Sequence, residues 1–337
     1  MIKRPTRTKR DKRKLHALSS QTIELINQVS VLAGSRSFLD DCRAEAERSK
    51  LVRAVRENKP AALFDALLTG FHYQGISDAV ARSYLRDHGS ASWTSITMDL
   101  KSACACPHLG GFADVRGCRY DKISFTCSEP DLIAGCPLPR YRLRNGRLNQ
   151  TAFSFYLFVR DVAGGNLITW IDRQLANPPS DQADQDRLVG PLRAVYGVSD
   201  KILTMTLSSL FIGMADERPS WFKAGIGMIA IDTLVHNFLH RTGILDQCSF
   251  PHAYGPLCYA PGGCADVIRK ASAKIDARVF NRSFPKNFPR FVQHAIWRYC
   301  AADGLDVCNG NRIDDRFTCQ NRPCRLYKEC AKTPLKA

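Results

Sequence analysis

Cysteine residues are the feature of this chain that most constrains its fold. The 337 residues include fourteen cysteines, and all but Cys42 fall into three groups. The groups are Cys104, Cys106, Cys118, Cys127 and Cys136, then Cys248, Cys258 and Cys264, and finally Cys300, Cys308, Cys319, Cys324 and Cys330. The basic N-terminus has no apolar segment behind it, so we do not expect a secretion signal. Reduced thiols that cluster in this way favour metal binding over disulfides.

The third group has the most regular spacing of the three. It reads Cys308-x10-Cys319-x4-Cys324-x5-Cys330. Four thiolates within 23 residues suit either a 4Fe–4S cluster or a zinc ion, and free thiols are the third possibility. Cys300 could take the place of Cys308. The basic residues Arg322, Arg325 and Lys328 lie among these cysteines, so the same loop could contact phosphate.

The other two groups are less regular. In the first, the candidate ligands of a second, structural zinc are Cys104, Cys106, Cys118 and Cys127. The second offers only three thiols and would need His252 or a distant cysteine to complete a site. We therefore do not predict an independent metal site at Cys248, Cys258 and Cys264.

The charge of the chain indicates a polyanionic partner. Lys and Arg outnumber Asp and Glu by 48 to 32, a formal charge of +16, and nucleic acid is the usual partner of such an excess. An ordinary basic protein is the alternative. Eight of the first fourteen residues are Lys or Arg, which predicts a disordered arm that contacts phosphates, or else a solubilising tail. The arm residues expected to bind are Lys3, Arg4, Arg7, Lys9 and Arg10. We find no apolar run long enough for a membrane span.

Helical periodicity dominates the rest of the chain. Apolar residues recur at helical spacing in the ranges 20–58, 61–73, 151–176, 188–196, 201–213 and 228–242. The segments 177–186 and 215–225 have the composition of loops. The range 101–150 carries five cysteines and little periodicity, so we expect an irregular, Cys-rich insertion. The class expected is all-α.

Three stretches, in this order, resemble a known superfamily. LFDALLTGFHYQGISDAVA at 63–81 resembles an apolar helix and a polar helix with Gln74 at the turn between them. YGVSDKILTMTLSSLFIG at 196–213 is similar to a hairpin followed by a lysine and an apolar helix. IAIDTLVHNFLHRTGIL at 229–245 is similar to a helix that begins with Asp. Together they resemble the helix-hairpin-helix (HhH-GPD) DNA glycosylases, and among these the endonuclease III-like enzymes.

The resemblance implies roles for particular residues. Lys201 would be the nucleophile that forms a Schiff base with the sugar, and Asp232 would be the catalytic carboxylate. Gly197 and Ser199 would belong to a hairpin that binds phosphate, and Gln74 would fill the gap left by an everted base. The alternatives are a surface lysine after a plain turn, a helix-capping aspartate and an exposed turn glutamine. Endonuclease III-like enzymes also carry a 4Fe–4S cluster near the C-terminus.

These observations lead to one principal hypothesis. The chain is expected to be a two-lobed, all-α, HhH-GPD-like glycosylase with abasic-site lyase activity, monomeric and bound to double-stranded DNA, in the nucleus or in the cytoplasm with the nucleoid. The expected ranges are an arm (1–19), N-terminal helices (20–100), the insertion (101–150), a core with the hairpin and catalytic helix (151–245) and the C-terminal helices with the Cys cluster (246–337). A non-catalytic DNA-binding protein of the same fold and a Cys-rich zinc protein that binds nucleic acid are the alternatives.

Overall fold

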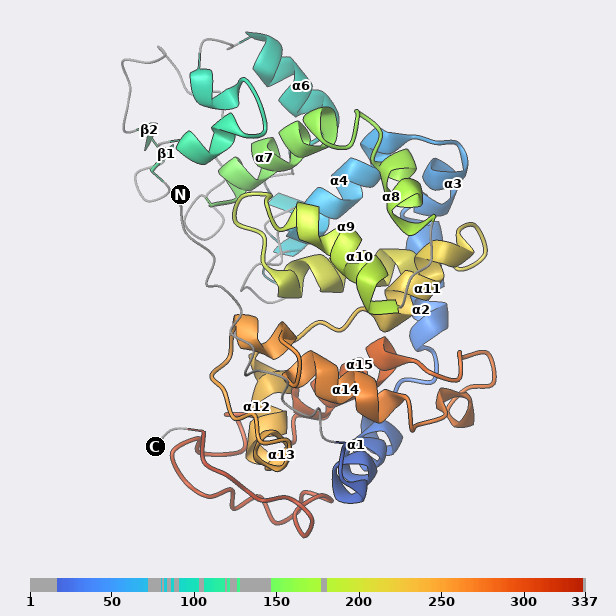
Figure 1. Ribbon diagram of the computed structural model, residues 1–337, viewed down its shortest axis with the longest axis vertical. Coiled ribbons are helices and arrows are strands. Elements are labelled where there is room, and N and C mark those ends of the chain that lie inside the picture. Colours follow the sequence, from blue (N-terminus) through green and yellow to red (C-terminus); the bar gives the residue numbers. More distant parts are fainter. Residues whose placement is uncertain are drawn as a thin grey trace, which may run out of the picture. The chain divides into compact units, whose positions relative to one another are not determined.

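The protein divides into two compact units, and each has its own set of helices. In the computed structural model, the described residues are 17–71, 91–102, 106–118, 147–176 and 181–335, with short pieces at 80, 82–83, 86–87, 120–121 and 126–127. Unit 1 combines Met1–Ser35 with Ile231–Ala337, and unit 2 is Arg36–Ala230. Figure 1 shows the elements coloured along the chain.

Unit 2 is a helical assembly, as the sequence predicts. Its α-helices are α2 (Phe38–Arg48), α3 (Leu51–Arg56), α4 (Pro60–Phe71), α6 (Trp93–Ser102), α7 (Arg147–Asp161), α8 (Leu167–Leu175), α9 (Asp181–Leu192), α10 (Asp200–Gly213) and α11 (Pro219–Gly227). Two short 3-10 turns, η1 (Pro107–Leu109) and η2 (Asp114–Gly117), and the two-residue strands β1 (Tyr120–Asp121) and β2 (Thr126–Cys127) lie in the expected irregular insertion. The strands pair antiparallel, with Tyr120 opposite Cys127.

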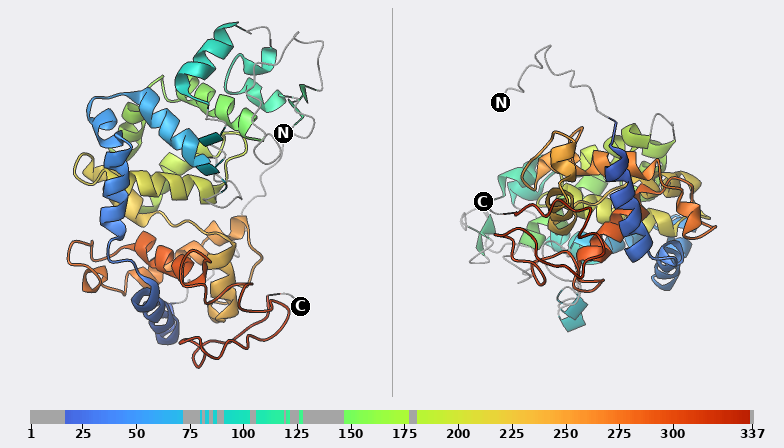
Figure 2. Two further views of the ribbon diagram at one scale, coloured as in Figure 1. Left: turned by 180° about the vertical axis from the view of Figure 1, so that it is seen from behind. Right: turned by 90° about the horizontal axis from the view of Figure 1, so that it is seen from below.

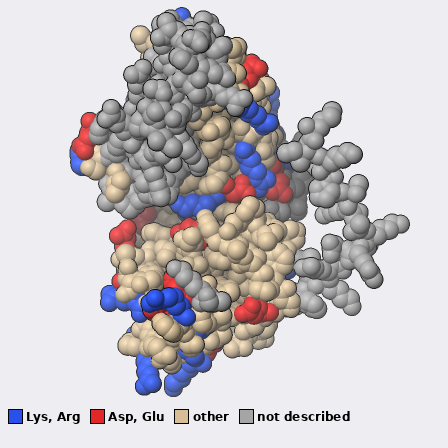
Figure 3. Space-filling model, turned by 90° about the vertical axis from the view of Figure 1, so that its left-hand side faces the viewer, with Lys and Arg blue, Asp and Glu red and all other residues tan. Residues whose placement is uncertain are grey.

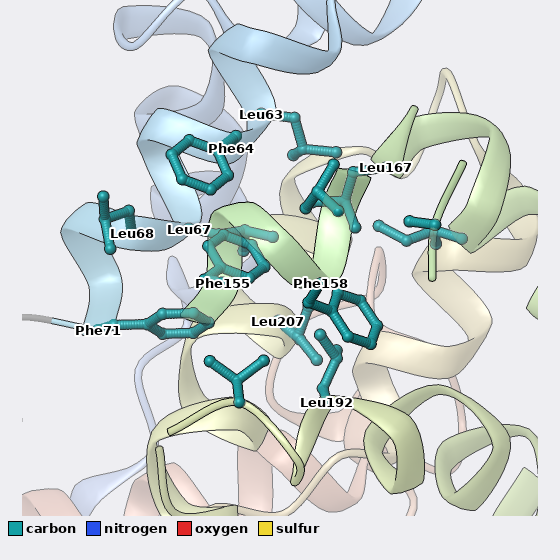
Figure 4. Close-up of a cluster of buried hydrophobic side chains, with 14 of the residues drawn as sticks. Leu63, Phe64, Leu67, Leu68, Phe71, Phe155, Phe158, Leu167, Leu192 and Leu207 are labelled. Atoms are coloured by element: carbon teal, nitrogen blue, oxygen red, sulfur yellow. The ribbon is translucent and has the colours of Figure 1, made fainter. Parts of the chain in front are cut away.

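An aromatic cluster forms the centre of unit 2 (Figure 4). Phe64 of α4 stacks on Phe155 of α7, with ring centroids 4.7 Å apart, and Phe71 meets the same ring edge-on at 5.0 Å. All three side chains are buried. Apolar residues at helical spacing lie on one face of a helix, so one face of α4 and one face of α7 contribute to this core. Core aromatic pairs of this kind dominate the apolar surface that a helical unit removes from water.

Unit 1 joins the first helix of the chain to its C-terminal part. Its helices are α1 (Ser20–Ala33), α12 (Thr233–Arg241), α13 (Ile244–Gln247), α14 (Cys264–Ser272) and α15 (Pro289–Cys300), with the 3-10 turns η4 (Pro256–Tyr259) and η5 (Ala277–Val279). Helices α1 and α15 pack side by side (Figure 2), and the Arg298 guanidinium donates to the Ala33 carbonyl at 3.0 Å. After α15 the chain runs to Leu335 without a further helix.

Several helix ends have clear physical causes. The Ser19 hydroxyl accepts from the Thr22 amide at 3.1 Å and begins α1. The Asn166 side chain begins α8 in the same way, because its carbonyl accepts from the Thr169 amide at 3.1 Å. Gly243 follows α12 with φ of +79°, the left-handed conformation that glycine adopts without a steric penalty.

The structure corrects several details of the sequence analysis. Residues 181–186, expected to belong to a loop, form the first part of α9, and the helix expected at 228–242 begins only at Thr233. The segment 215–225, expected to be a loop, contains most of α11. Pro219 starts this helix, and Trp221 is buried against Phe211, with ring centroids 4.9 Å apart. The range 20–58 is helical but forms three helices, interrupted at Gly34–Ser37 and at Ser49–Lys50. The all-α class is confirmed for the described residues. No helix among them is long and apolar enough to cross a membrane.

Candidate functional site

A short loop joins α9 to α10 and has the geometry of a helical hairpin. The loop covers residues 193–199, and Gly197 in it has φ of +75°. A side chain at this position would meet its own backbone, so the turn depends on glycine. The Val198 amide donates to the Val195 carbonyl at 3.4 Å, which closes the turn just before α10 begins.

Helix α7 supports this loop from the inside. The Tyr196 amide donates to the Ser154 hydroxyl at 2.9 Å, and the Thr151 hydroxyl donates to the Tyr196 carbonyl at 2.8 Å. Ser154 and Thr151 are both buried. Because buried hydroxyls must find partners, these two bonds explain polar residues on an otherwise apolar helix face. They hold the backbone of the hairpin in one position.

Lys201 lies in the first turn of α10. Ser199 occupies the N-cap position, and its side chain makes no capping hydrogen bond. The first amides of a helix have no partner within the helix, and the helix dipole favours negative charge there. The ammonium group of Lys201 adds positive charge to this helix end, while the neighbouring Asp200 carboxylate is paired with Arg193 at 2.7 Å.

Asp232 caps α12. Its carboxylate accepts from the Val235 amide at 2.9 Å, and its side chain is half-buried. Two tyrosines fasten the residue before it, because the Tyr259 hydroxyl accepts from the Ile231 amide at 2.9 Å and the Tyr254 hydroxyl donates to the Ile231 carbonyl at 3.4 Å. Burial raises the pKa of the Tyr254 phenol, and the negative charge of the nearby Asp232 raises it further.

The other residues predicted for the site have different outcomes. Lys201 belongs to unit 2 and Asp232 to unit 1. Gln74, the arm residues Lys3, Arg4, Arg7, Lys9 and Arg10, and Cys104 lie outside the described residues. Cys106 and Cys118 are half-buried against the core of unit 2, and only the backbone of Cys127 is described. The zinc site expected from these cysteines therefore stays a prediction.

The four cysteines predicted as C-terminal metal ligands line one pocket. The pocket lies in unit 1 and contains Cys308, Cys319, Cys324 and Cys330 in its wall, together with apolar side chains such as Phe238, Val307 and Leu326. Cys300, considered as a replacement for Cys308, lies at the end of α15 and is not part of this wall. The thiol of Cys300 instead donates to Cys308, which, with Arg241 nearby, lowers the pKa of Cys308.

Three of these four sulfur atoms lie close to hydrogen-bonding groups. The Tyr299 hydroxyl lies 3.1 Å from Cys324 Sγ, the Lys332 amide donates to Cys330 Sγ at 3.3 Å, and the Arg241 guanidinium donates to Cys308 Sγ at 3.8 Å. Burial and the neighbouring thiols together raise the pKa of Cys330 to about 11. Four thiolates would repel one another here unless a cation compensated for their charge.

A second group, which the sequence analysis did not predict, brings two histidines and two cysteines to one point in unit 1. His236, His252, Cys258 and Cys264 each offer one ligand atom, and these four atoms all lie within 4.8 Å of one another. The group could hold a metal ion. Among the described residues, no other set of His, Cys, Asp and Glu converges in this way.

Hydrogen bonding within this group shifts the pKa values of its two thiols in opposite directions. The Cys264 thiol donates to Cys258, so the pKa of Cys258 falls to about 4 while that of Cys264 rises. The histidines His236 and His252 further lower the pKa of Cys258. The opposite shifts describe two thiols that share one proton through their hydrogen bond, so the pair titrates as a unit.

The sequence contained partial signals for this group. His252 was considered as a possible partner of the cysteines, but His236 was missed because it lies on α12 among residues that resemble a plain apolar face. The pair Cys258-x5-Cys264 with Gly262 and Gly263 between its members was the useful signal, since a glycine turn can bring two thiols together. Cys248, which belongs to the same cluster in sequence, is not in the group.

Charge on the surface is mixed. Figure 3 shows Lys and Arg side chains in several separate places on the face it presents, with Asp and Glu among them.

In comparisons with known proteins, no family model, no curated protein and no solved structure matches this chain.

Proposed function

We propose that the protein is a DNA glycosylase with abasic-site lyase activity, in which Lys201 is the nucleophile and Asp232 the assisting carboxylate. The observation that carries the proposal is the α9–α10 hairpin, with Gly197 at φ of +75° and a lysine in the first turn of α10. It supports the proposal because the resemblance to helix-hairpin-helix glycosylases implies a hairpin followed by a lysine at residues 196–201. The net charge of +16 supports a nucleic acid as the partner.

The hairpin would bind the DNA backbone. A phosphate placed at the start of α10 would accept hydrogen bonds from the first amides of the helix and would be attracted by its dipole. The missing side-chain cap at Ser199 supports this role, because a capping hydroxyl would compete for the same amides. The hydrogen bonds that the Tyr196 amide donates to Ser154 and the Tyr196 carbonyl accepts from Thr151 would keep the hairpin rigid when it binds.

Lys201 would act as a neutral amine. Its nitrogen would attack the anomeric carbon C1′ of the everted nucleotide, and the glycosidic bond would break with its electrons leaving on the base, which takes up a proton. The attached nitrogen would lose a proton and the sugar ring would open: the C1′–O4′ bond breaks, O4′ takes up a proton, and C1′ and the nitrogen form a protonated Schiff base. Loss of a proton from C2′ of this Schiff base would then expel the 3′ phosphate. Asp232 would stabilise positive charge on the sugar during the first step.

The C-terminal pocket supports a 4Fe–4S cluster in preference to a single zinc ion. In such a cluster each thiolate binds a different iron, so the four sulfur atoms must surround a volume instead of meeting at one point. Cys308, Cys319, Cys324 and Cys330 line a pocket, and they are not among the residues whose ligand atoms converge. Donors from Tyr299, Lys332 and Arg241 to three of these sulfurs suit the charge of a bound cluster.

Borohydride trapping tests the enzymatic proposal. Full-length protein is mixed with a duplex oligonucleotide that contains an abasic site, and borohydride reduces any Schiff base to a stable covalent adduct. We expect an adduct with the wild type and a fall of about a thousandfold or more in its rate of formation for Lys201→Ala. Lys223→Ala, which removes the same charge from α11 of the same unit, is the matched control and should form the adduct normally.

Two results would overturn this assignment. Adduct formation that survives in Lys201→Ala would exclude Lys201 as the nucleophile. A wild type that binds abasic DNA without any adduct would favour the alternative of a non-catalytic DNA-binding protein.

A separate measurement tests the cluster. Anaerobically purified protein should be brown, with absorption at about 400 nm and bound iron and sulfide. Cys324→Ser should lose most of the colour, whereas Cys248→Ser should keep it. Colourless wild-type protein from an iron-replete preparation would exclude the cluster.

A further inference from the structure

We propose that His236, His252, Cys258 and Cys264 form a closed, structural zinc site that fastens three segments of unit 1 to one another. The segments are α12, which carries His236, the loop that carries His252 and Cys258, and the start of α14, which carries Cys264. This inference does not depend on the glycosylase proposal, because it concerns only the metal bound within unit 1.

The distances within the group fit tetrahedral zinc. His236 Nδ1 lies 3.3 Å from Cys264 Sγ and 3.5 Å from Cys258 Sγ, and His252 Nε2 lies 3.4 Å from Cys264 Sγ. Zinc bonds of about 2.3 Å to sulfur and about 2.05 Å to nitrogen, at the tetrahedral angle, place N and S about 3.6 Å apart. These three N–S distances are therefore already close to the spacing that the ion imposes, and all four ligand atoms lie within 4.8 Å of one another.

The second nitrogen of His252 has the partner that metal-binding histidines require. His252 Nδ1 lies 2.7 Å from the Phe250 carbonyl. A carbonyl can only accept, so Nδ1 carries the proton and donates it, which leaves the lone pair of Nε2 facing Cys264. Histidines that bind zinc usually donate their other ring N–H to a neighbouring acceptor such as a backbone carbonyl, which fixes the tautomer.

Burial and charge both favour zinc with four protein ligands. Cys258 and Cys264 are 0% exposed, His236 is 5% exposed and His252 is half-buried. Because the four side chains supply four ligands, a bound tetrahedral ion would keep no open position for water. Two thiolates balance the charge of a divalent ion, and two neutral imidazoles complete the coordination. The resulting site is neutral overall, which a buried environment tolerates far better than separate charges.

The loop between the two cysteines is shaped to bring them together. Gly262 has φ of +85°, and a side chain on Gly263 would lie 2.2 Å from the Leu257 carbonyl oxygen, so both positions demand glycine. The Gly262 amide also donates to the Asp266 carboxylate at 2.9 Å. The turn thus returns the chain from Cys258 in η4 to Cys264, the first residue of α14, with five residues between the two cysteines.

Metal analysis of the full-length protein, purified without added metal or chelator, tests the proposal. We expect at least one equivalent of zinc per chain in the wild type, of which this site holds one. Cys258→Ser and His252→Asn should each lose most of this zinc. Cys248→Ser is the matched control, because Cys248 belongs to the same stretch of sequence but not to the group, and it should retain the full equivalent.

A cobalt measurement covers the case in which the ligand variants do not fold. Wild-type protein produced with Co²⁺ in place of zinc should show the visible absorption of a tetrahedral ion and a thiolate charge-transfer band. Cys324→Ser should retain zinc while losing iron, which separates this site from the C-terminal pocket.

Three results would overturn the proposal. They are wild-type protein without zinc, zinc that stays in full in both Cys258→Ser and His252→Asn, and a disulfide between Cys258 and Cys264 in freshly purified protein. None of these results depends on whether Lys201 forms an adduct with DNA, so the two proposals fail independently.

Discussion

Asp232 illustrates how one residue serves a structural and a proposed chemical role. Its carboxylate accepts from the Val235 amide and thereby begins α12. The glycosylase proposal gives the same group the task of stabilising charge on the sugar. The two roles can be separated because a cap needs only an oxygen acceptor, whereas the chemistry needs a negative charge.

Substitutions at Asp232 should therefore have different effects on stability and activity. Asp232→Asn keeps an acceptor oxygen and should change the free energy of unfolding little, while Asp232→Ala should lower it by about 1 kcal/mol. Both should lose base excision on a lesion oligonucleotide. Urea denaturation and product analysis measure the two effects. Full activity in Asp232→Asn would restrict this residue to capping.

His294 on α15 should make the stability of unit 1 depend on pH. Burial, with Arg290 and Arg298 nearby, lowers the pKa of His294 to about 3, whereas an unfolded histidine has a pKa of about 6.5. Below pH of about 6.5 the unfolded state binds a proton that the folded state does not. The stabilising contribution is complete above that pH and is lost as the pH falls towards about 3, at up to about 1.4 kcal/mol per pH unit.

The variant His294→Gln should show a flatter dependence. Urea unfolding of wild type and variant at a series of pH values between about 6.5 and 4 measures the difference. Parallel curves for the two proteins would show that His294 is not protonated on unfolding in this range.

At the level of elements, packing between helices decided whether some segments became helix or loop, where local sequence did not. Segment 215–225 has loop-like composition, yet α11 forms because Trp221 fills a buried position and donates its indole N–H to Asp172 at 2.7 Å. Periodicity predicted α4 and α10 well, since their apolar faces repeat regularly along the sequence. The same reasoning failed for α11, because its stabilising contacts come from residues distant in sequence.

The hairpin between α9 and α10 allows a comparison of two glycines. Gly197→Ala should lower the free energy of unfolding by about 1–2 kcal/mol, because alanine is strained at φ of +75°. Gly190→Ala in α9 is the matched control, since no atom lies within 4 Å of the added methyl group, and it should raise stability by up to about 1 kcal/mol. Denaturant unfolding measures both. Equal effects would mean that the turn tolerates a side chain.

The same pair of variants bears on the DNA-binding role of the hairpin. Gly197→Ala should weaken binding to duplex DNA, and Gly190→Ala should not. Unchanged binding by a folded Gly197→Ala protein would remove the hairpin from the DNA interface.

At the scale of the whole molecule, the units are assembled from segments that are far apart in the chain. Unit 1 pairs α1 with the C-terminal helices, and unit 2 contains everything between them. The sequence analysis divided the chain into successive ranges, such as 20–100 and 246–337. A division of this kind does not predict that α1 packs on α15. The pairing depends on complementary surfaces, which periodicity alone does not identify.

Removal of residues 1–14 tests the predicted arm. The deletion removes eight basic residues, so the slope of log K against log salt concentration should become shallower by about 0.9 for each phosphate that the arm neutralises. Duplex DNA binding measured at several salt concentrations gives the slope. A slope that does not change would show that the arm does not bind phosphates.

The sequence by itself determined the helical class, because apolar residues repeat with the helical period through most of the described chain. It also placed four thiols at the C-terminus close enough along the chain to line one pocket, as Cys308, Cys319, Cys324 and Cys330 do. Short-range spacing is sufficient in both cases.

Only the tertiary structure decided which side chains meet at the His236, His252, Cys258 and Cys264 group. His236 comes from a helix that precedes the cysteine loop, and Cys248, nearer to Cys258 in sequence than His236 is, stays outside. Ligand atoms converge through the packing of α12 against the loop and α14, and distances along the chain carry no direct information about that packing.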